Sequence, residues 1–271
     1  MAFASVSEDV SLHYQDLGVG HPVILIHGGC MSHRVWESQV CTLLDNGYRV
    51  ITPDLRGHGH SAKPVSPYTA EMYADDIASL MDALDVERAA VAGWSLGATI
   101  AATFACHHTA RLERLLLTSS NIFHHIAPAS ETDGGGNRLP LQKMIDNQRC
   151  DRPRGMERFV SGMFATNADR WTVQWLWSIG MQTPMRVAVK TLQIYEEPET
   201  ETIRGAIADL RVPVGVFHGG RDGSATVSEA ESIATEIATD GTFASFDESG
   251  HVPFLEQPER FNDQLVQFLE T

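Results

Sequence analysis

The sequence predicts an α/β fold with a doubly wound, mostly parallel sheet. Short β-branched runs alternate with amphipathic segments along the 271 residues, which is the pattern of repeated β-α units covered on both faces. Each run is too short for a typical helix and is closely followed by Gly, Asp or Ser. With 43% hydrophobic residues, the chain is long enough for one domain with a sizeable core. The clearest strand candidates are residues 23–26, 48–52, 89–92, 115–117 and 212–217.

Three segments between and after these strands show the apolar spacing of a helix. One covers residues 36–44 and ends at Asn46-Gly47, a stop signal, and another covers residues 73–84. The third follows Pro258, which suits a first helical turn. We expect each helix to pack one apolar stripe against the sheet.

The β-α alternation stops between about residues 121 and 205. Prolines, a Gly134-Gly135-Gly136 run and helix-like segments replace it. We predict a helical lid here, inserted into a core domain made of residues 1–120 and 206–271. Trp171 and Trp175 are four residues apart and would share a helical face, and Trp177 lies nearby. These side chains suit either packing or the lining of an apolar pocket.

The charge balance limits the partners. Acidic residues outnumber basic ones by 35 to 20, so the formal net charge is −15. Nucleic acid and anionic membranes would be repelled, and we expect neither as a partner. The N-terminal residues lack the basic start and apolar run of a signal peptide, and no apolar stretch approaches the ~18 residues that span a bilayer. We expect a cytoplasmic protein; its oligomeric state, including a homo-oligomer, stays open.

No cofactor or metal is expected. The four cysteines, Cys30, Cys41, Cys106 and Cys150, are widely spaced and fit neither a disulfide framework nor a zinc site. Residues 54–61 are rich in His and Gly but lack the His-Glu-x-x-His spacing of a zinc hydrolase, and glycines between polar groups suffice to shape a loop. Neither a phosphate loop nor a dinucleotide fingerprint occurs.

The strongest motif is Gly93-Trp94-Ser95-Leu96-Gly97, which follows the strand at 89–92 and precedes a helix-like run at 98–106. A nucleophile at a sharp strand-to-helix turn needs small residues two positions away on each side, because larger side chains would collide with the turning backbone. Ser95 is therefore the predicted nucleophile.

A serine hydroxyl needs a base to remove its proton as it attacks. Among the 12 histidines, His251 lies in a loop between the last strand-like run and the final helix. Loops at the carboxyl edge of a parallel sheet can face one another. His251 is the predicted general base.

The third member should be a carboxylate that orients the imidazole and stabilises its charged form. Asp222 follows the strand at 212–217 and precedes His251, in the order Ser, acid, His. After the strand ending near Thr118 the chain offers Asn121 and no nearby carboxylate, and Asp247 and Glu248 lie too close to His251 in sequence. Asp222 is the predicted acid.

The loop His27-Gly28-Gly29-Cys30 follows the first strand of the group. It can bring a second backbone N–H to a developing oxyanion, so we predict an oxyanion hole made of the N–H groups of Gly29 and Leu96. His27 is expected to hold the loop by hydrogen bonding. Nothing marks Cys30 as a low-pKa thiolate, so it is not the expected nucleophile.

These motifs resemble those of the α/β-hydrolase fold superfamily along nearly the whole chain. His27-Gly28-Gly29 resembles its oxyanion loop, residues 54–61 its Asp-x-x-Gly-x-Gly-x-Ser segment, and residues 93–97 its nucleophile elbow. Within the superfamily the chain is similar to small lidded serine esterases, haloperoxidase-like esterases, enol-lactonases and acyl-homoserine-lactone hydrolases. The resemblance implies cofactor-free chemistry, and Ser95 separates the chain from dehalogenases and epoxide hydrolases, which use aspartate at that position.

The expected function is a serine hydrolase that cleaves a small or medium, uncharged carboxylic ester or lactone through an acyl-enzyme. Two alternatives stay open: a carbon–carbon bond hydrolase with the same three residues, and a low-turnover ligand receptor on the same fold. The side chains expected to line the pocket are Cys30, Trp94, Trp171, Trp175 and Trp177.

Overall fold

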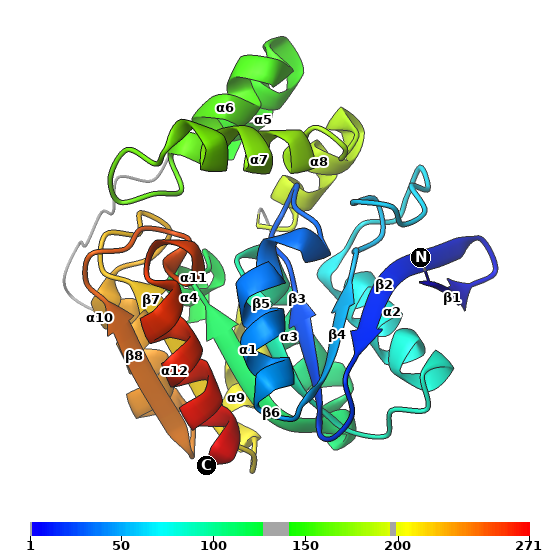
Figure 1. Cartoon of the computed structure of the whole chain (residues 1–271), viewed down its shortest axis with the longest axis vertical. Helices are drawn as coiled ribbons and strands as arrows, with labels where there is room; N and C mark the ends of the chain where they lie inside the picture. Colours follow the sequence, from blue (N-terminus) through cyan, green and yellow to red (C-terminus); the bar gives the residue numbers. More distant parts are fainter. Residues whose placement is uncertain (1, 127–140, 196–198) are drawn as a thin grey trace.

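The computed structural model describes residues 2–126, 141–195 and 199–271; the predicted Gly134-Gly135-Gly136 run lies outside the described residues. Eight strands form one sheet in the order β1-β2-β4-β3-β5-β6-β7-β8 (Figure 1). Strands β3 to β8 are parallel, while β2 runs antiparallel to both β1 and β4. This confirms the predicted mostly parallel sheet. The strands are β1 Ala2–Ser7, β2 Val10–Leu17, β3 Pro22–Ile26, β4 Arg49–Pro53, β5 Ala89–Trp94, β6 Leu112–Thr118, β7 Val214–Gly219 and β8 Gly241–Phe246.

Helices cover both faces of the sheet. Successive side chains of a strand point to opposite faces, so one strand can contribute to two separate core clusters. In β3, Ile24 and Ile26 join one buried cluster, and Val23 and Leu25 join the other. The first cluster contains the helices α2 Ala70–Ala83 and α3 Leu96–His107. The second contains α1 Glu37–Asp45 and α12 Pro258–Glu270. Shorter helices, α10 Val227–Ser232 and α11 Pro253–Glu256, complete the layers.

In the described residues between β6 and β7 there are six helices: α4 Ile122–Ile126, α5 Leu141–Cys150, α6 Arg152–Ser161, α7 Arg170–Gly180, α8 Met185–Gln193 and α9 Thr200–Asp209. Helix α9 packs against α3 and α4, beside the core. Helices α5 to α8, here called the helical insertion, lie above the carboxyl ends of the parallel strands (Figure 1). The start of α7 is fixed by Asp169, whose carboxylate accepts hydrogen bonds from the N–H groups of Trp171 and Thr172.

Most apolar side chains of the parallel strands and of the helices beside them are buried in these two core clusters. Among the described residues, no helix is long and apolar enough to cross a membrane.

Candidate active site

Ser95 lies at the sharp turn between β5 and α3. Its backbone has φ 56° and ψ −118°, a conformation that residues with a side chain rarely adopt. The turn closes because its flanking glycines lack side chains. A Cβ on Gly93 would lie 2.1 Å from the carbonyl oxygen of Gly97, and one on Gly97 would lie 2.2 Å from that of Ile26. The predicted need for small residues at both positions is confirmed.

The structure brings Ser95, His251 and Asp222 together. The Oγ of Ser95 lies 2.9 Å from Nε2 of His251, and Nδ1 of His251 lies 2.9 Å from Oδ2 of Asp222. They come from the loops that follow β5, β8 and β7, which meet at the carboxyl edge of the sheet. A carboxylate only accepts, so Nδ1 carries the proton and the lone pair of Nε2 accepts from the serine hydroxyl.

Asp222 is buried but stays ionised. Burial disfavours its charge, yet His251, His218 and the N–H of Ser224 together outweigh that effect and hold the pKa of Asp222 below its usual range. Ser224 donates to it twice, from its N–H and its hydroxyl, both at 2.8 Å. The imidazole therefore faces a fixed negative charge.

The backbone of His251 is held from two directions. Its carbonyl oxygen accepts from Nε1 of Trp94 at 2.7 Å, and its N–H donates to the carbonyl oxygen of Met163 at 2.6 Å. Next to it, the carboxylate of Glu256 accepts from the N–H of Gly250 at 2.7 Å and from that of Ala165 at 2.8 Å. Met163 and Ala165 connect α6 to α7, so the histidine loop is tied both to the core and to the helical insertion.

A cavity of about 530 Å³ opens beside Ser95 and His251. Gly29 and Leu96 also line it, and a Cβ on Gly29 would lie 3.8 Å from the Leu96 side chain. Leu96 is the first residue of α3, so its N–H has no acceptor within the helix. Helices α5, α6 and α8 supply much of the rest of the wall, with the side chains Lys143, Met144, Asn147, Gln148, Arg158, Phe159, Thr191 and Leu192.

The loop that carries Gly29 is fixed by His27. Its Nδ1–H donates to the carbonyl oxygen of Gly28 at 2.8 Å, and its Nε2 accepts from the N–H of Leu55 at 3.0 Å. Burial lowers the pKa of His27 to about 4, despite the nearby charge of Asp54. The ring is neutral at pH 7 and acts as a hydrogen-bonded link, which confirms the role expected from the sequence.

Of the five expected pocket residues, only Cys30 lines the cavity, and burial raises the pKa of its thiol to about 11, against the opposing charge of Arg152. The expectation for the tryptophans was wrong. Trp94 is 1% exposed and packs edge-to-face against Phe254, because its side chain leaves β5 on the face of the sheet that holds the second core cluster.

The three tryptophans of the insertion lie on α7, and within the described part of the chain α7 supplies no residue to the cavity wall. Trp171 is 74% exposed. Trp175 and Trp177 pack partly buried against the second core cluster, and Nε1 of Trp177 donates to the carbonyl oxygen of Pro153 at 2.9 Å. The sequence left open whether these side chains pack or line a pocket, and Trp175 and Trp177 pack.

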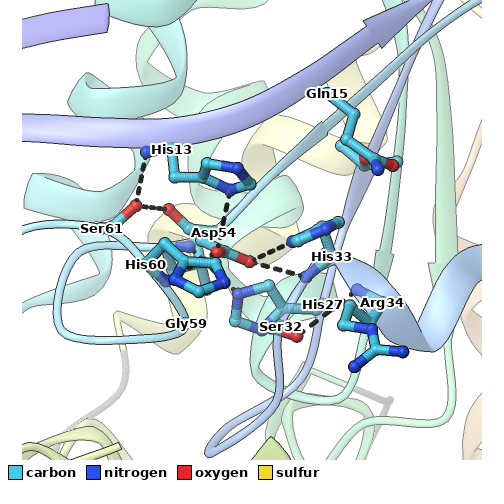
Figure 2. Close-up of polar contacts among 12 residues, drawn as sticks. His13, Gln15, His27, Ser32, His33, Arg34, Asp54, Gly59, His60 and Ser61 are labelled. Carbon is cyan, nitrogen blue, oxygen red and sulfur yellow. Dashed lines mark hydrogen bonds and ion pairs between the residues drawn. The ribbon is translucent and has the colours of Figure 1, made fainter. Parts of the chain in front are cut away.

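Sequence spacing missed a second cluster, built around Asp54 (Figure 2). Nδ1 of His33 lies 2.7 Å from the Asp54 carboxylate and Nδ1 of His13 lies 3.1 Å from it. The ligand atoms of these three buried residues lie within 4.8 Å of one another, close enough to hold a metal ion. The carboxylate also accepts the N–H groups of His33 and His60, both at 2.8 Å, so four protein donors already satisfy it. The cluster joins β2, the end of β4 and the loop after β3.

Comparisons with known proteins agree with this architecture. Residues 21–258 match the α/β-hydrolase fold family, and the chain belongs to this family. It is 29% identical over 271 residues to the AB hydrolase superfamily protein YisY of Bacillus subtilis, covering 98% of both chains. It is 31% identical to the pimeloyl-[acyl-carrier protein] methyl ester esterase of Aromatoleum aromaticum, over 88% of this chain and 93% of that one.

Among solved structures, the bromoperoxidase from Bacillus anthracis superposes with a TM-score of 0.89 at 23% identity, covering 100% of this chain and 99% of the other. At that identity the likeness concerns the fold. The chain is therefore an α/β hydrolase by fold and family, with esterases among its relatives.

Proposed function

We propose that this protein hydrolyses carboxylic esters or lactones, with Ser95 as nucleophile, His251 as general base and Asp222 as the acid that orients His251. One observation carries the proposal. An unbroken hydrogen-bonded chain, with two contacts of 2.9 Å, runs from a buried carboxylate to a serine hydroxyl that opens into a cavity. This arrangement lets a weak nucleophile lose its proton during attack.

In the first half of the reaction, Ser95 Oγ attacks the acyl carbon while its proton moves to Nε2 of His251. Asp222 stabilises the imidazolium that forms. The negative charge on the former carbonyl oxygen is stabilised by the N–H groups of Gly29 and Leu96, aided by the positive end of α3. When the carbon–oxygen bond breaks, Nε2 returns the proton to the leaving alcohol and Ser95 carries the acyl group.

In the second half, His251 removes a proton from water, which attacks the acyl carbon through the same oxyanion site. The bond to Ser95 breaks, the serine recovers its proton and the carboxylic acid leaves. With a lactone, the alcohol and the acid stay in one molecule, so the product is a hydroxy acid. The esterase among the relatives supports an ester as the substrate class.

A phosphonylating reagent tests this proposal, because its adduct resembles the tetrahedral intermediate and requires an activated hydroxyl. We expect one label on the peptide containing residues 93–97, together with turnover of a short activated ester. Ser95→Ala should abolish both. Ser178→Ala, which removes an exposed hydroxyl on α7, should change neither.

Two outcomes would contradict the proposal in different ways. Labelling that persists in Ser95→Ala would refute the nucleophile. Stoichiometric labelling without turnover of any ester or lactone would instead favour a carbon–carbon bond hydrolase or a ligand receptor.

A further inference from the structure

Two cationic side chains of the helical insertion line the cavity. Lys143 lies on α5 and Arg158 on α6, across the cavity from Ser95. Cations are the scarcer charge in this chain, which has 20 basic and 35 acidic residues. Among the described residues, Asp222 is the only acidic residue in the cavity wall, and its carboxylate is bound to His251 and Ser224. The cavity wall therefore carries a surplus of positive charge.

Among the residues that the structure describes, no carboxylate pairs with either cation. In the described part of the chain, Lys143 makes no ion pair, and Arg158 makes one weak side-chain contact, donating to Oδ1 of Asn147 at 3.3 Å. The neighbouring arginines of α6 differ. Arg152 donates to Oε1 of Gln148 at 2.5 Å and to backbone carbonyls, and Arg154 lies 3.8 Å from the Asp151 carboxylate and outside the cavity wall.

We propose that Lys143 and Arg158 form an anion subsite, and that the substrate carries a carboxylate or phosphate at the end remote from the carbonyl that Ser95 attacks. The inference rests on the proposed function and names the substrate class of the same site. It replaces the uncharged ester expected from the sequence with an anionic one.

The side chains of the subsite and the size of the cavity both fit an anionic substrate. A guanidinium offers paired donors in the geometry of carboxylate and phosphate oxygens, and an ammonium adds a compact charge. The amide of Asn147, which also lines the cavity, supplies a neutral donor beside them. The 530 Å³ cavity leaves room for a chain of several atoms between the reacting carbonyl and the anion.

The test uses pairs of esters of equal chain length whose terminal group is charged in one and neutral in the other. Monomethyl esters of straight-chain dicarboxylic acids are compared with methyl esters of monocarboxylic acids of equal length, and a matched series ending in phosphate separates the two anions. We expect the wild-type protein to prefer one anionic series in kcat/KM by about tenfold at its best length. The preference should shrink as salt screens the charges.

Lys143→Met and Arg158→Gln should each lower the ratio of kcat/KM for the anionic ester to kcat/KM for the neutral ester by roughly three- to tenfold. Both side chains are exposed, so the variants should fold. Arg149→Gln is the matched control, since it removes the same charge from an exposed position of α5 outside the cavity wall.

The outcomes separate this inference from the function on which it rests. If neutral esters are cleaved in a Ser95-dependent way but anionic esters are no better and the two variants resemble Arg149→Gln, the anion subsite is refuted and the hydrolase stands. If no ester is cleaved and Ser95 is not labelled, the proposed function itself fails.

Discussion

Ser95 holds a backbone conformation that costs free energy in isolation, and its neighbours hold it there. The N–H of Ser95 donates to the carbonyl oxygen of Thr118 at 2.9 Å, and its own carbonyl oxygen accepts from Oγ of Ser120 at 2.8 Å. Strain of this kind persists where the surrounding structure over-determines it. The bonds to β6 and the loop after it thus keep Oγ directed at His251.

The elbow glycines give a prediction with a matched control. Gly97→Ala places a methyl group against the backbone of β3, and we expect it to destabilise the fold by roughly 1–3 kcal/mol or more and to abolish Ser95 labelling. Gly205→Ala adds the same methyl in α9, where nothing lies within 4 Å, and should stabilise by roughly 0.5–1 kcal/mol. Thermal unfolding and labelling rate check both. Equal behaviour of the two variants would contradict the packing argument.

Asp222→Asn should leave the fold intact and lower kcat by about 10⁴-fold, because an amide no longer holds the proton of His251 on Nδ1 or stabilises the imidazolium. Asp247→Asn is the control; its carboxylate accepts from Oγ of Ser245 at 2.5 Å, away from the imidazole. Ester turnover and circular dichroism are the measurements. Near-normal turnover in Asp222→Asn would show that another carboxylate orients His251.

Some residues around the cavity could be predicted from the sequence and others could not. Ser95, Asp222 and His251 could be found because each follows a strand whose apolar run is visible, and strand ends meet at one edge. Trp171 was wrongly predicted to line the pocket, because the sequence does not show which side of a helix faces the cavity and which faces outward. Lys143 and Arg158 carried no signal, since nothing in the sequence separates them from the other charged residues of the insertion.

At the scale of the elements, the buried parallel strands were predictable and the edge strands were not. The predicted runs at 89–92 and 212–217 correspond to β5 and β7, which are buried along their whole length. By contrast, Ala4 is the only buried residue of β1, and the second half of β2, residues 14–17, has no buried residue. An antiparallel pair of strands at the edge of a sheet needs no continuous apolar run. A search for such runs in the sequence therefore does not find β1 and β2.

Two buried imidazoles in adjacent loops make the fold sensitive to acid. Burial lowers the pKa of His27 to about 4 and that of His58 to about 3. In the unfolded chain both return to about 6.5, so below that pH the unfolded state binds more protons and stability falls. Each ring should cost about 2 kcal/mol of stability between pH 8 and pH 5.

Denaturant unfolding at several pH values checks this expectation. His58→Asn keeps a donor for the carbonyl oxygen of Arg56, which His58 now reaches at 2.9 Å, but removes the titration. The gap in stability between wild type and variant should therefore narrow as the pH falls from 8 to 5. A gap that stays constant would show that His58 does not contribute to the acid sensitivity.

At the scale of the whole molecule, the helical insertion is in direct contact with the loop that carries His251. Gly250 lies so close to the connection between α6 and α7 that a Cβ there would be 2.6 Å from the carbonyl oxygen of Met163. The N–H of His251, the proposed general base, donates to that same oxygen, so a shift of the insertion would move the backbone of His251. The insertion thus contributes both a cavity wall and part of the support of His251.

Glu256 is the positioning residue in this contact, because its carboxylate joins Ala165 of the insertion to Gly250 of the catalytic loop. Burial raises the pKa of Glu256, although the two N–H groups oppose that shift. Glu256→Gln leaves one of the two N–H groups facing an amide nitrogen, and we expect kcat and the rate of Ser95 phosphonylation to fall roughly threefold to tenfold with KM little changed. Glu259→Gln, an equal charge change at an exposed position of α12, should alter neither rate. If Glu256→Gln lowered only the unfolding temperature and kept the wild-type labelling rate at 25 °C, the contact would be structural and the insertion would not help to position His251.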